Sequence, residues 1–208
     1  MAEIPVPERA LHVLAEQLAA EQSVISPHVT DPEGTDPALG LLAAAGPRAA
    51  DAPGEYSLLV ESVREGYLLH YGEPRVVVGA DADLALLAGD YLYALGLERL
   101  AGLGDLEAIR ELSDLISLSA QLHDAGGDEA PAGGRAGNAL WLASVTVVAS
   151  GTTPDHEQGK AALREGRSGA AAVLWQAALR TARQSGLGDR LERAAEAIGF
   201  EQHQDLPA

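Results

Sequence analysis

The segment from residue 84 to residue 101 constrains the fold most, because its apolar side chains recur at the spacing of an α-helix. A helix that is apolar on most sides is buried among other helices. Gly89 and Asp90 stand inside this pattern, where a glycine costs about 1 kcal/mol relative to alanine and a carboxylate needs a polar partner. The segment therefore predicts a central helix that packs closely at Gly89, with Asp90 buried and bonded to a neighbouring helix. The apolar positions are Leu84, Leu86, Leu87, Ala88, Tyr91, Leu92, Tyr93, Leu95, Leu97 and Leu100.

The remainder of the chain predicts further helices joined by short connections. Residues 75–79 are expected to be extended, and the Gly/Ala/acid-rich residues 125–138 are expected to form a mobile loop. The patterns predict an all-α helical bundle of seven or eight helices. Residues 1–55 form an N-terminal helix and a Pro/Gly-rich connector packed on the bundle, and residues 56–208 form the helical core. The further helices are expected at 6–22, 38–45, 56–71, 105–123, 138–150, 153–184 and 187–198.

Individual residues mark where helices begin. Asp81, Asp105 and Thr153 are of the type that caps helix N-termini, because their side-chain oxygens accept bonds from free backbone N–H groups. Gly166 and Gly169 fall inside the range 153–184, where we expect them to permit close helix packing.

Charge and composition exclude several classes of function. The chain has 208 residues, a formal net charge of −17 and no cysteine. Such an acidic surface repels nucleic-acid phosphates and anionic lipid, and without cysteine there is no disulfide or thiolate metal site. No secretory signal is visible, and no apolar run approaches the ~20 residues of a membrane span. We therefore expect a cytoplasmic protein that binds no nucleic acid and spans no membrane.

Several short segments occur in an order that is typical of one enzyme family. Leu86–Tyr91 contains the string Leu-Ala-Gly-Asp-Tyr; Gly72-Glu73-Pro74 precedes it, and Gly104-Asp105-Leu106-Glu107 and Ala162–Arg167 follow it. In this order, between about residues 56 and 176, they resemble the isoprenyl (polyprenyl) diphosphate synthases. The resemblance implies a partial isoprenyl-synthase-like fold with motif positions at Gly72, Pro74, Gly89 and Asp90.

The catalytic motifs of that family are altered or missing here. The first aspartate-rich motif corresponds to Glu61-Ser62-Val63-Arg64-Glu65, and the second corresponds to residues 175–178, which contain no acid. Prenyl transfer needs magnesium ions held by carboxylates of two facing helices. Glu61 and Glu65 are therefore interpreted as a surface acid pair, or at most as a vestigial metal site. We expect no catalytic residue and no cofactor.

The resemblance also implies positions for a product pocket. Tyr56 and Ser57 correspond to residues that help to set product length in the family, and Tyr91 is a further candidate. The alternative for the tyrosines is that Tyr67, Tyr71, Tyr91 and Tyr93 belong to the helical core. His70, His123 and His156 lack metal-ligand spacing and are interpreted as ordinary side chains.

In character the chain is most similar to the non-catalytic small subunit of heptaprenyl diphosphate synthase. That resemblance implies a non-catalytic or regulatory subunit in isoprenoid biosynthesis. It would form a hetero-oligomer with a catalytic prenyl diphosphate synthase, or a homodimer, through the helix at 84–101. Two alternatives remain open. One is a shortened prenyltransferase or terpene-synthase-like enzyme that acts on allylic diphosphates with magnesium held partly by Glu61 and Glu65. The other is an unrelated helical scaffold protein.

Overall fold

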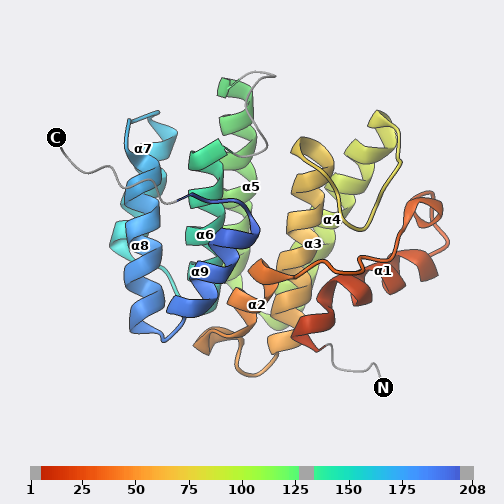
Figure 1. The fold of residues 1–208 in the computed structure, drawn as a ribbon, viewed down its shortest axis with the longest axis horizontal. Helices are drawn as coiled ribbons and strands as arrows, with labels where there is room; N and C mark the ends of the chain where they lie inside the picture. Colours follow the sequence, from red (N-terminus) through yellow and green to blue (C-terminus); the bar gives the residue numbers. More distant parts are fainter. Residues whose placement is uncertain (1–5, 127–133, 202–208) are drawn as a thin grey trace.

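The computed structural model describes residues 6–126 and 134–201, and these form an all-α helical bundle (Figure 1). This confirms the predicted fold class. The part of the predicted loop that covers residues 127–133 lies outside the described residues. The helices are α1 (Ala10–Ala20), α2 (Ala38–Ala44), α3 (Pro53–Tyr71), α4 (Ala82–Leu103), α5 (Leu106–Gly126), α6 (Gly134–Ser150), α7 (Pro154–Arg164), α8 (Ala170–Gln184) and α9 (Gly188–Ala197), with short 3-10 turns at Pro7–Arg9, Ser26–His28 and Pro47–Ala49.

The helix at the centre of the bundle is α6, which packs against α2, α5, α8 and α9. Every residue from Ala139 to Ala149 is buried. The β-branched run Val145–Val148 favours a strand by local propensity, but burial among helices on all sides keeps it helical. The prediction of a helix at 138–150 is therefore confirmed.

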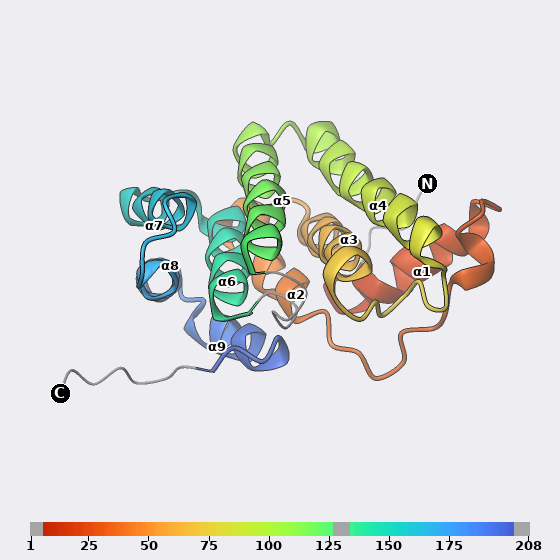
Figure 2. The same ribbon diagram turned by 90° about the horizontal axis from the view of Figure 1, so that it is seen from above.

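The α4 helix lies at the edge of the bundle, so the prediction of a central helix there is wrong (Figure 2). The buried residues of α4 lie on one side of the helix. Leu86 and Leu87 lie outside that side, and their exposed fractions are 52% and 57%. The interpretation of Asp90 as a buried acid is also wrong, because its side chain is 77% exposed. Asp90 does approach a neighbouring helix: its Oδ1 lies 3.3 Å from Nε2 of His70 on α3.

Close packing at Gly89 is confirmed, because α3 and α4 meet at glycines. A Cβ added to Gly89 would lie 2.5 Å from Nε2 of His70, and one added to Gly66 would lie 2.8 Å from the backbone oxygen of Gly89. Farther along α4, a Cβ on Gly96 would lie 2.5 Å from Cγ2 of Val63. Gly66, Gly89 and Gly96 therefore allow a close approach of the two helices that side chains at these positions would hinder.

The predicted helix at 153–184 is two helices, α7 and α8. Gly166 and Gly169 stand in the connection with φ values of 61° and 83°, in the left-handed region that favours glycine. They turn the chain, so the prediction that they permit close helix packing is wrong. The predicted N-caps are confirmed: Asp81, Asp105 and Thr153 accept hydrogen bonds from the backbone N–H groups of Leu84, Ala108 and His156.

The extended residues after α3 pair with the N-terminal connector. Val77 and Val29 form an isolated antiparallel bridge, and the N–H groups of Thr30 and Val78 donate to carbonyl oxygens across it. A smaller apolar cluster beside this bridge joins α1 to α3 and α4, separately from the main core. Within the described ranges, no helix combines the length and apolar character needed to cross a lipid bilayer.

Candidate functional site

The two acids at the position of the family's first aspartate-rich motif are fully buried. Glu61 and Glu65 lie one turn apart on α3, and both are 0% exposed. The interpretation of this pair as a solvated surface pair is therefore wrong. A buried carboxylate must be paired and hydrogen-bonded to persist as an anion, so the partners of these two acids decide their role.

Arg75 is the shared partner of both acids. Its Nη1 donates to Glu61 Oε2 at 2.7 Å, and its Nε donates to Glu65 Oε2 at 3.1 Å. The Gly72-Glu73-Pro74 turn reverses the chain after α3, which places Arg75 back against that helix. The charges of Glu61 and Glu65, together with their hydrogen bonds, outweigh burial and raise the pKa of Arg75.

Backbone N–H groups occupy the remaining oxygens of the acid pair. Glu65 Oε1 accepts from the amides of Arg75, Val76 and Val77 at 2.8, 2.7 and 3.2 Å. Glu61 Oε1 accepts from the amide of Gly40 at 2.7 Å. All four carboxylate oxygens therefore have a protein donor. A magnesium ion would have to displace Arg75 to reach them, so the geometry fits an internal ion cluster and does not fit a metal site.

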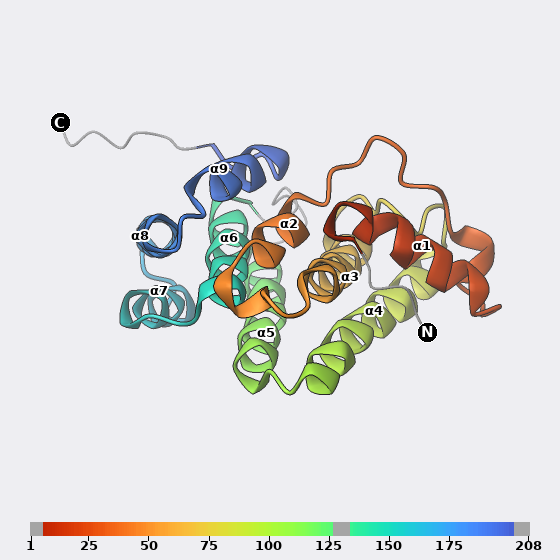
Figure 3. The same ribbon diagram turned by 90° about the horizontal axis from the view of Figure 1, so that it is seen from below.

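A cavity of about 520 Å³ opens beside this cluster. Its wall includes residues of α2 and α3 and the end of α9, and Figure 3 shows how these three helices are arranged. Glu61, Arg64 and Arg75 contribute to its wall. Cavities of this size are typical of small-molecule sites. Tyr56, Ser57 and Tyr91, the predicted product-pocket residues, do not contribute to its wall. The full lining is Gly34, Thr35, Asp36, Ala38, Leu39, Glu61, Arg64, Leu68, Arg75, Ala197 and Ile198.

Arg64 is the unusual residue of the cavity wall. It is only 8% exposed, and burial lowers its pKa to about 10. Its guanidinium carbon lies 4.8 Å from the ring centroid of Tyr67 and 4.8 Å from that of Trp141. These cation–π contacts partly replace the lost solvation. Its Nη1 is buried and has no hydrogen-bond partner in the structure.

The predicted product-pocket residues are held by other contacts and are not brought together around one space. Tyr56 donates to Asp105 Oδ2 at 2.6 Å, and burial together with that carboxylate raises the pKa of Tyr56 to about 12. Ser57 donates to the carbonyl oxygen of Pro7 at 2.9 Å. On α4, Tyr91 donates to Glu21 at 2.7 Å, and burial together with Glu21 raises the pKa of Tyr91 to about 12.

The other tyrosines and two histidines form an aromatic contact between helices. Tyr67 is buried in the core, and its hydroxyl lies 2.9 Å from Nε2 of His123. Tyr71 stacks on His123 with ring centroids 4.0 Å apart, and His70 stacks on Tyr93 at 5.3 Å. These positions confirm the interpretation of Tyr67, Tyr71 and Tyr93 as packing residues.

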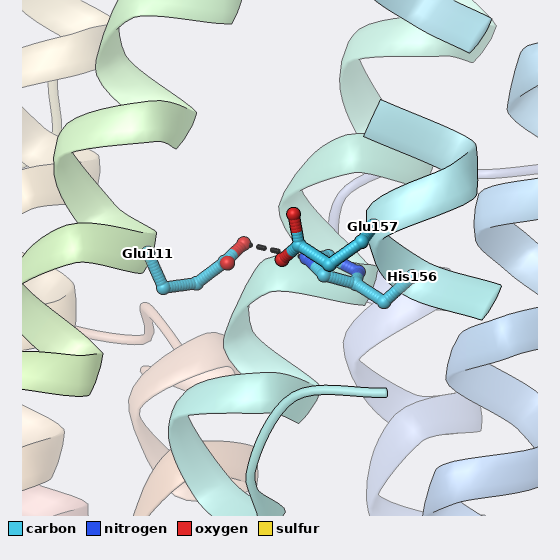
Figure 4. Close-up of side chains that lie close together, drawn as sticks. All are labelled: Glu111, His156 and Glu157. Carbon is cyan, nitrogen blue, oxygen red and sulfur yellow. Dashed lines mark hydrogen bonds and ion pairs between the residues drawn. The ribbon is translucent and has the colours of Figure 1, made fainter. Parts of the chain in front are cut away.

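A second buried charge cluster, which the sequence analysis missed, joins α5 to α7. Oε1 of Glu111 on α5 lies 2.7 Å from Nε2 of His156 (Figure 4). Lys160 donates to Oε2 of Glu111 at 2.7 Å. His156 and Lys160 stand four residues apart on α7, a spacing that places two side chains on one helix face. That spacing was the available signal, but it does not reveal the acid on a distant helix.

The geometry of this second cluster resembles a metal site only in part. Ligand atoms of Glu111, His156 and Glu157 lie within 4.8 Å of one another. However, Lys160 Nζ lies 2.7 Å from Glu111 Oε2 and 3.0 Å from Glu157 Oε1, so an ammonium group already pairs with both acids. Burial opposes this charge pairing, yet His156 and Lys160 lower the pKa of Glu111 to about 2. The arrangement fits a structural ion cluster.

Each buried acid cluster is paired with a cation of the same chain. Arg75 pairs with Glu61 and Glu65 on α3, and Lys160 pairs with Glu111 in the α5–α7 cluster. A further arginine, Arg64, lines the cavity beside the α3 acids. Compared with known proteins, the chain matches no family model, no curated protein and no solved structure.

Proposed function

We propose that this chain is a non-catalytic helical subunit that acts by assembling with a catalytic prenyl diphosphate synthase in isoprenoid biosynthesis. The class of partner comes from the sequence resemblance around Leu86–Tyr91 and the ordered segments that flank it. The buried acids of α3 support the absence of independent catalysis, and the exposed surface of α4 supports action through assembly.

The observation that carries the proposal is the pairing of Glu61 and Glu65 with Arg75. Ionisation of an allylic diphosphate needs metal ions that bridge its oxygens and are held by carboxylates. In this chain the corresponding carboxylates have donors on every oxygen, and an arginine supplies the positive charge. The same helix therefore has a stabilising role where the family uses it for catalysis.

The surface that supports assembly is the outer side of α4. Leu86 and Leu87 are more than half exposed there, with Asp90 beside them. Because about half of each leucine side chain is already buried, covering the rest contributes about 1 kcal/mol each, which is enough to influence an association. Because the chain carries a net charge of −17, the partner surface around these leucines is expected to be apolar with a neutral or basic rim.

The proposal is tested by co-expressing the tagged chain with a prenyl diphosphate synthase from the same cell that has both aspartate-rich motifs. We expect the two chains to co-elute in size-exclusion chromatography and prenyl transfer to increase in the complex. The double substitution Leu86→Glu/Leu87→Glu is expected to weaken the complex about tenfold or more, because it buries charge where apolar contact is needed.

A matched control keeps this experiment specific to α4. Val173 is an exposed apolar residue on α8, on the far side of the bundle from α4 (Figure 1). Val173→Glu should leave the complex intact, and all variants should keep the helical circular dichroism of the wild type. Two results would count against the proposal: no complex with any such synthase, or magnesium-dependent prenyl transfer by the isolated chain.

A further inference from the structure

Arg64 stands apart from the other buried charges of the described residues. Glu61 and Glu65 are paired with Arg75, and Glu111 is paired with Lys160. Arg64 is also buried, but it forms no ion pair within 4 Å of a described carboxylate, and its Nη1 has no hydrogen-bond partner. A buried guanidinium group whose N–H donors lack acceptors is costly unless a ligand accepts hydrogen bonds from it. The missing acceptors therefore indicate that the cavity which Arg64 lines is built for a ligand with hydrogen-bond acceptors.

We infer that this cavity binds a small organic monocarboxylate with an apolar tail, with its carboxylate on Arg64. A guanidinium group presents parallel N–H donors that match the two oxygens of a carboxylate. Arg75 also lines the cavity and adds positive charge there, although its Nε and Nη1 already donate to Glu65 and Glu61.

The charges around the cavity favour a ligand with a single negative charge. Arg75 is already balanced by Glu61 and Glu65, and these two acids exceed it by one charge. Arg64 restores neutrality within the group, and the exposed Asp36 adds a further negative charge at the rim. A phosphate dianion would bring twice the negative charge of a monocarboxylate into this neutral group and towards Asp36, so the monocarboxylate is favoured of the two.

The rest of the wall suits an apolar tail. Leu39 from α2, Leu68 from α3 and Ile198 after α9 contribute side chains to it, together with two alanines. The volume of about 520 Å³ leaves room for a chain of several carbons beside the carboxylate. Asp36, which is exposed, lies at the solvent opening, so the tail is expected to lie inside while the ligand enters past the rim.

The test uses octanoate as the probe, with octanol and octyl phosphate as comparisons, in isothermal titration calorimetry with the full chain. We expect octanoate to bind one per chain, and octanol and octyl phosphate to bind about tenfold or more weakly. Trp141 gives an independent signal, because its ring contacts the Arg64 guanidinium. In a Trp175→Phe background, octanoate should change the fluorescence of Trp141 with the same dissociation constant.

Variants separate a binding role of Arg64 from a structural one. Arg64→Met is expected to remain folded, because Glu61 and Glu65 keep their hydrogen bonds to Arg75 and to backbone amides, and to lose octanoate affinity about tenfold or more. Arg64→Lys keeps the positive charge but lacks the parallel N–H donors of the guanidinium group, so it should bind octanoate more weakly than the wild type does. Asp36→Asn removes the rim charge and should tighten binding about twofold. Arg164→Gln, a half-exposed arginine on α7, is the matched control and should bind as the wild type does.

The inference is overturned if octanoate does not bind, or binds no more tightly than octanol. Octyl phosphate binding as tightly as octanoate would overturn the assignment to a monocarboxylate. If Arg64→Met does not fold, Arg64→Lys and Asp36→Asn still decide the question. Unchanged affinity in both of those variants would show that octanoate does not bind beside Arg64.

Discussion

Replacing Arg75 by methionine removes the cation that holds Glu61 and Glu65 inside the fold. In the wild type, Arg75 donates to both carboxylates from a largely buried position between α3 and the cavity. In the variant, both acids remain buried at the same place, because they lie on the inner side of a long helix. Each loses one donor and its countercharge.

The cost follows from what the acids retain. Removing one partner of a buried ion pair typically costs about 3–5 kcal/mol, because the remaining charge is uncompensated. Two charges are left here, but backbone amides still donate to one oxygen of each acid. We therefore expect Arg75→Met to lower the free energy of unfolding by about 3–5 kcal/mol. For a chain of this size, that corresponds to a melting temperature about 10 °C lower.

Urea titration followed by circular dichroism measures this change, and a triple variant tests its cause. Glu61→Gln/Glu65→Gln/Arg75→Met removes all three charges, so it should be more stable than Arg75→Met by about 2 kcal/mol or more. Arg180→Met is the control: its ion pair with Asp155 is exposed, so its loss should cost less than about 1 kcal/mol. A cost below about 1 kcal/mol for Arg75→Met, or a triple variant no more stable than Arg75→Met, would refute the reasoning.

Two further predictions concern the α5–α7 cluster and the contact of α3 with α4. Because the pKa of Glu111 in the fold is about 2, against an ordinary 4.5, its pairing with His156 and Lys160 stabilises the protein above pH 4.5 and is lost as the pH falls towards 2. In urea titrations across that range, the free energy of unfolding of the wild type should fall by about 3 kcal/mol more than that of Glu111→Gln; equal pH dependence would contradict this. Gly66→Ala should lower stability by about 1–3 kcal/mol in thermal melts, because its Cβ meets backbone of α4, whereas Gly102→Ala, where the space is open, should raise stability by about 0.5–1 kcal/mol; equal effects would show that the helix contact tolerates a side chain.

The helical architecture could be predicted from local signals because they act over a few residues. Asp81 and Thr153 cap helices through bonds to backbone groups three residues away, and the same local chemistry is visible in the sequence. The connection between α7 and α8 was not predicted, because the sequence does not show whether Gly166 and Gly169 belong to a packed helix or to a turn. Only the backbone angles distinguish these two uses of glycine.

The position of α4 could not be predicted because burial depends on the number of helices that pack around it. Its apolar residues occur on most sides, as in a central helix, yet Leu86 and Leu87 remain exposed. By contrast, α6 combines small and β-branched residues without a clear stripe, and it is the most enclosed helix. The periodicity shows which faces are apolar, but it does not show which of those faces the bundle covers.

The buried ion pairs could not be predicted for two reasons. Their partners are far apart along the chain, and the spacing of Glu61 and Glu65 is also that of an exposed acid pair. The spacing of Glu61, Arg64 and Glu65 is typical of an exposed helix, where two acids and a neighbouring base lie in solvent. In the structure the base that pairs with them is Arg75, beyond the turn, while Arg64 points to aromatic rings. A one-turn spacing fixes which residues share a face, and tertiary packing decides what that face meets.

The cavity beside Arg64 has a wall assembled from both ends of the folding chain. Asp36 and Leu39 come early in translation, Arg64 and Arg75 follow, and Ile198 comes after all the other helices have been made. A ribosome-bound chain that stops before α9 lacks Ala197 and Ile198, the part of the cavity wall at the end of that helix. A molecule that binds against the whole wall therefore acts only after synthesis has passed α9, and it links α2 and α3 to α9 late in folding.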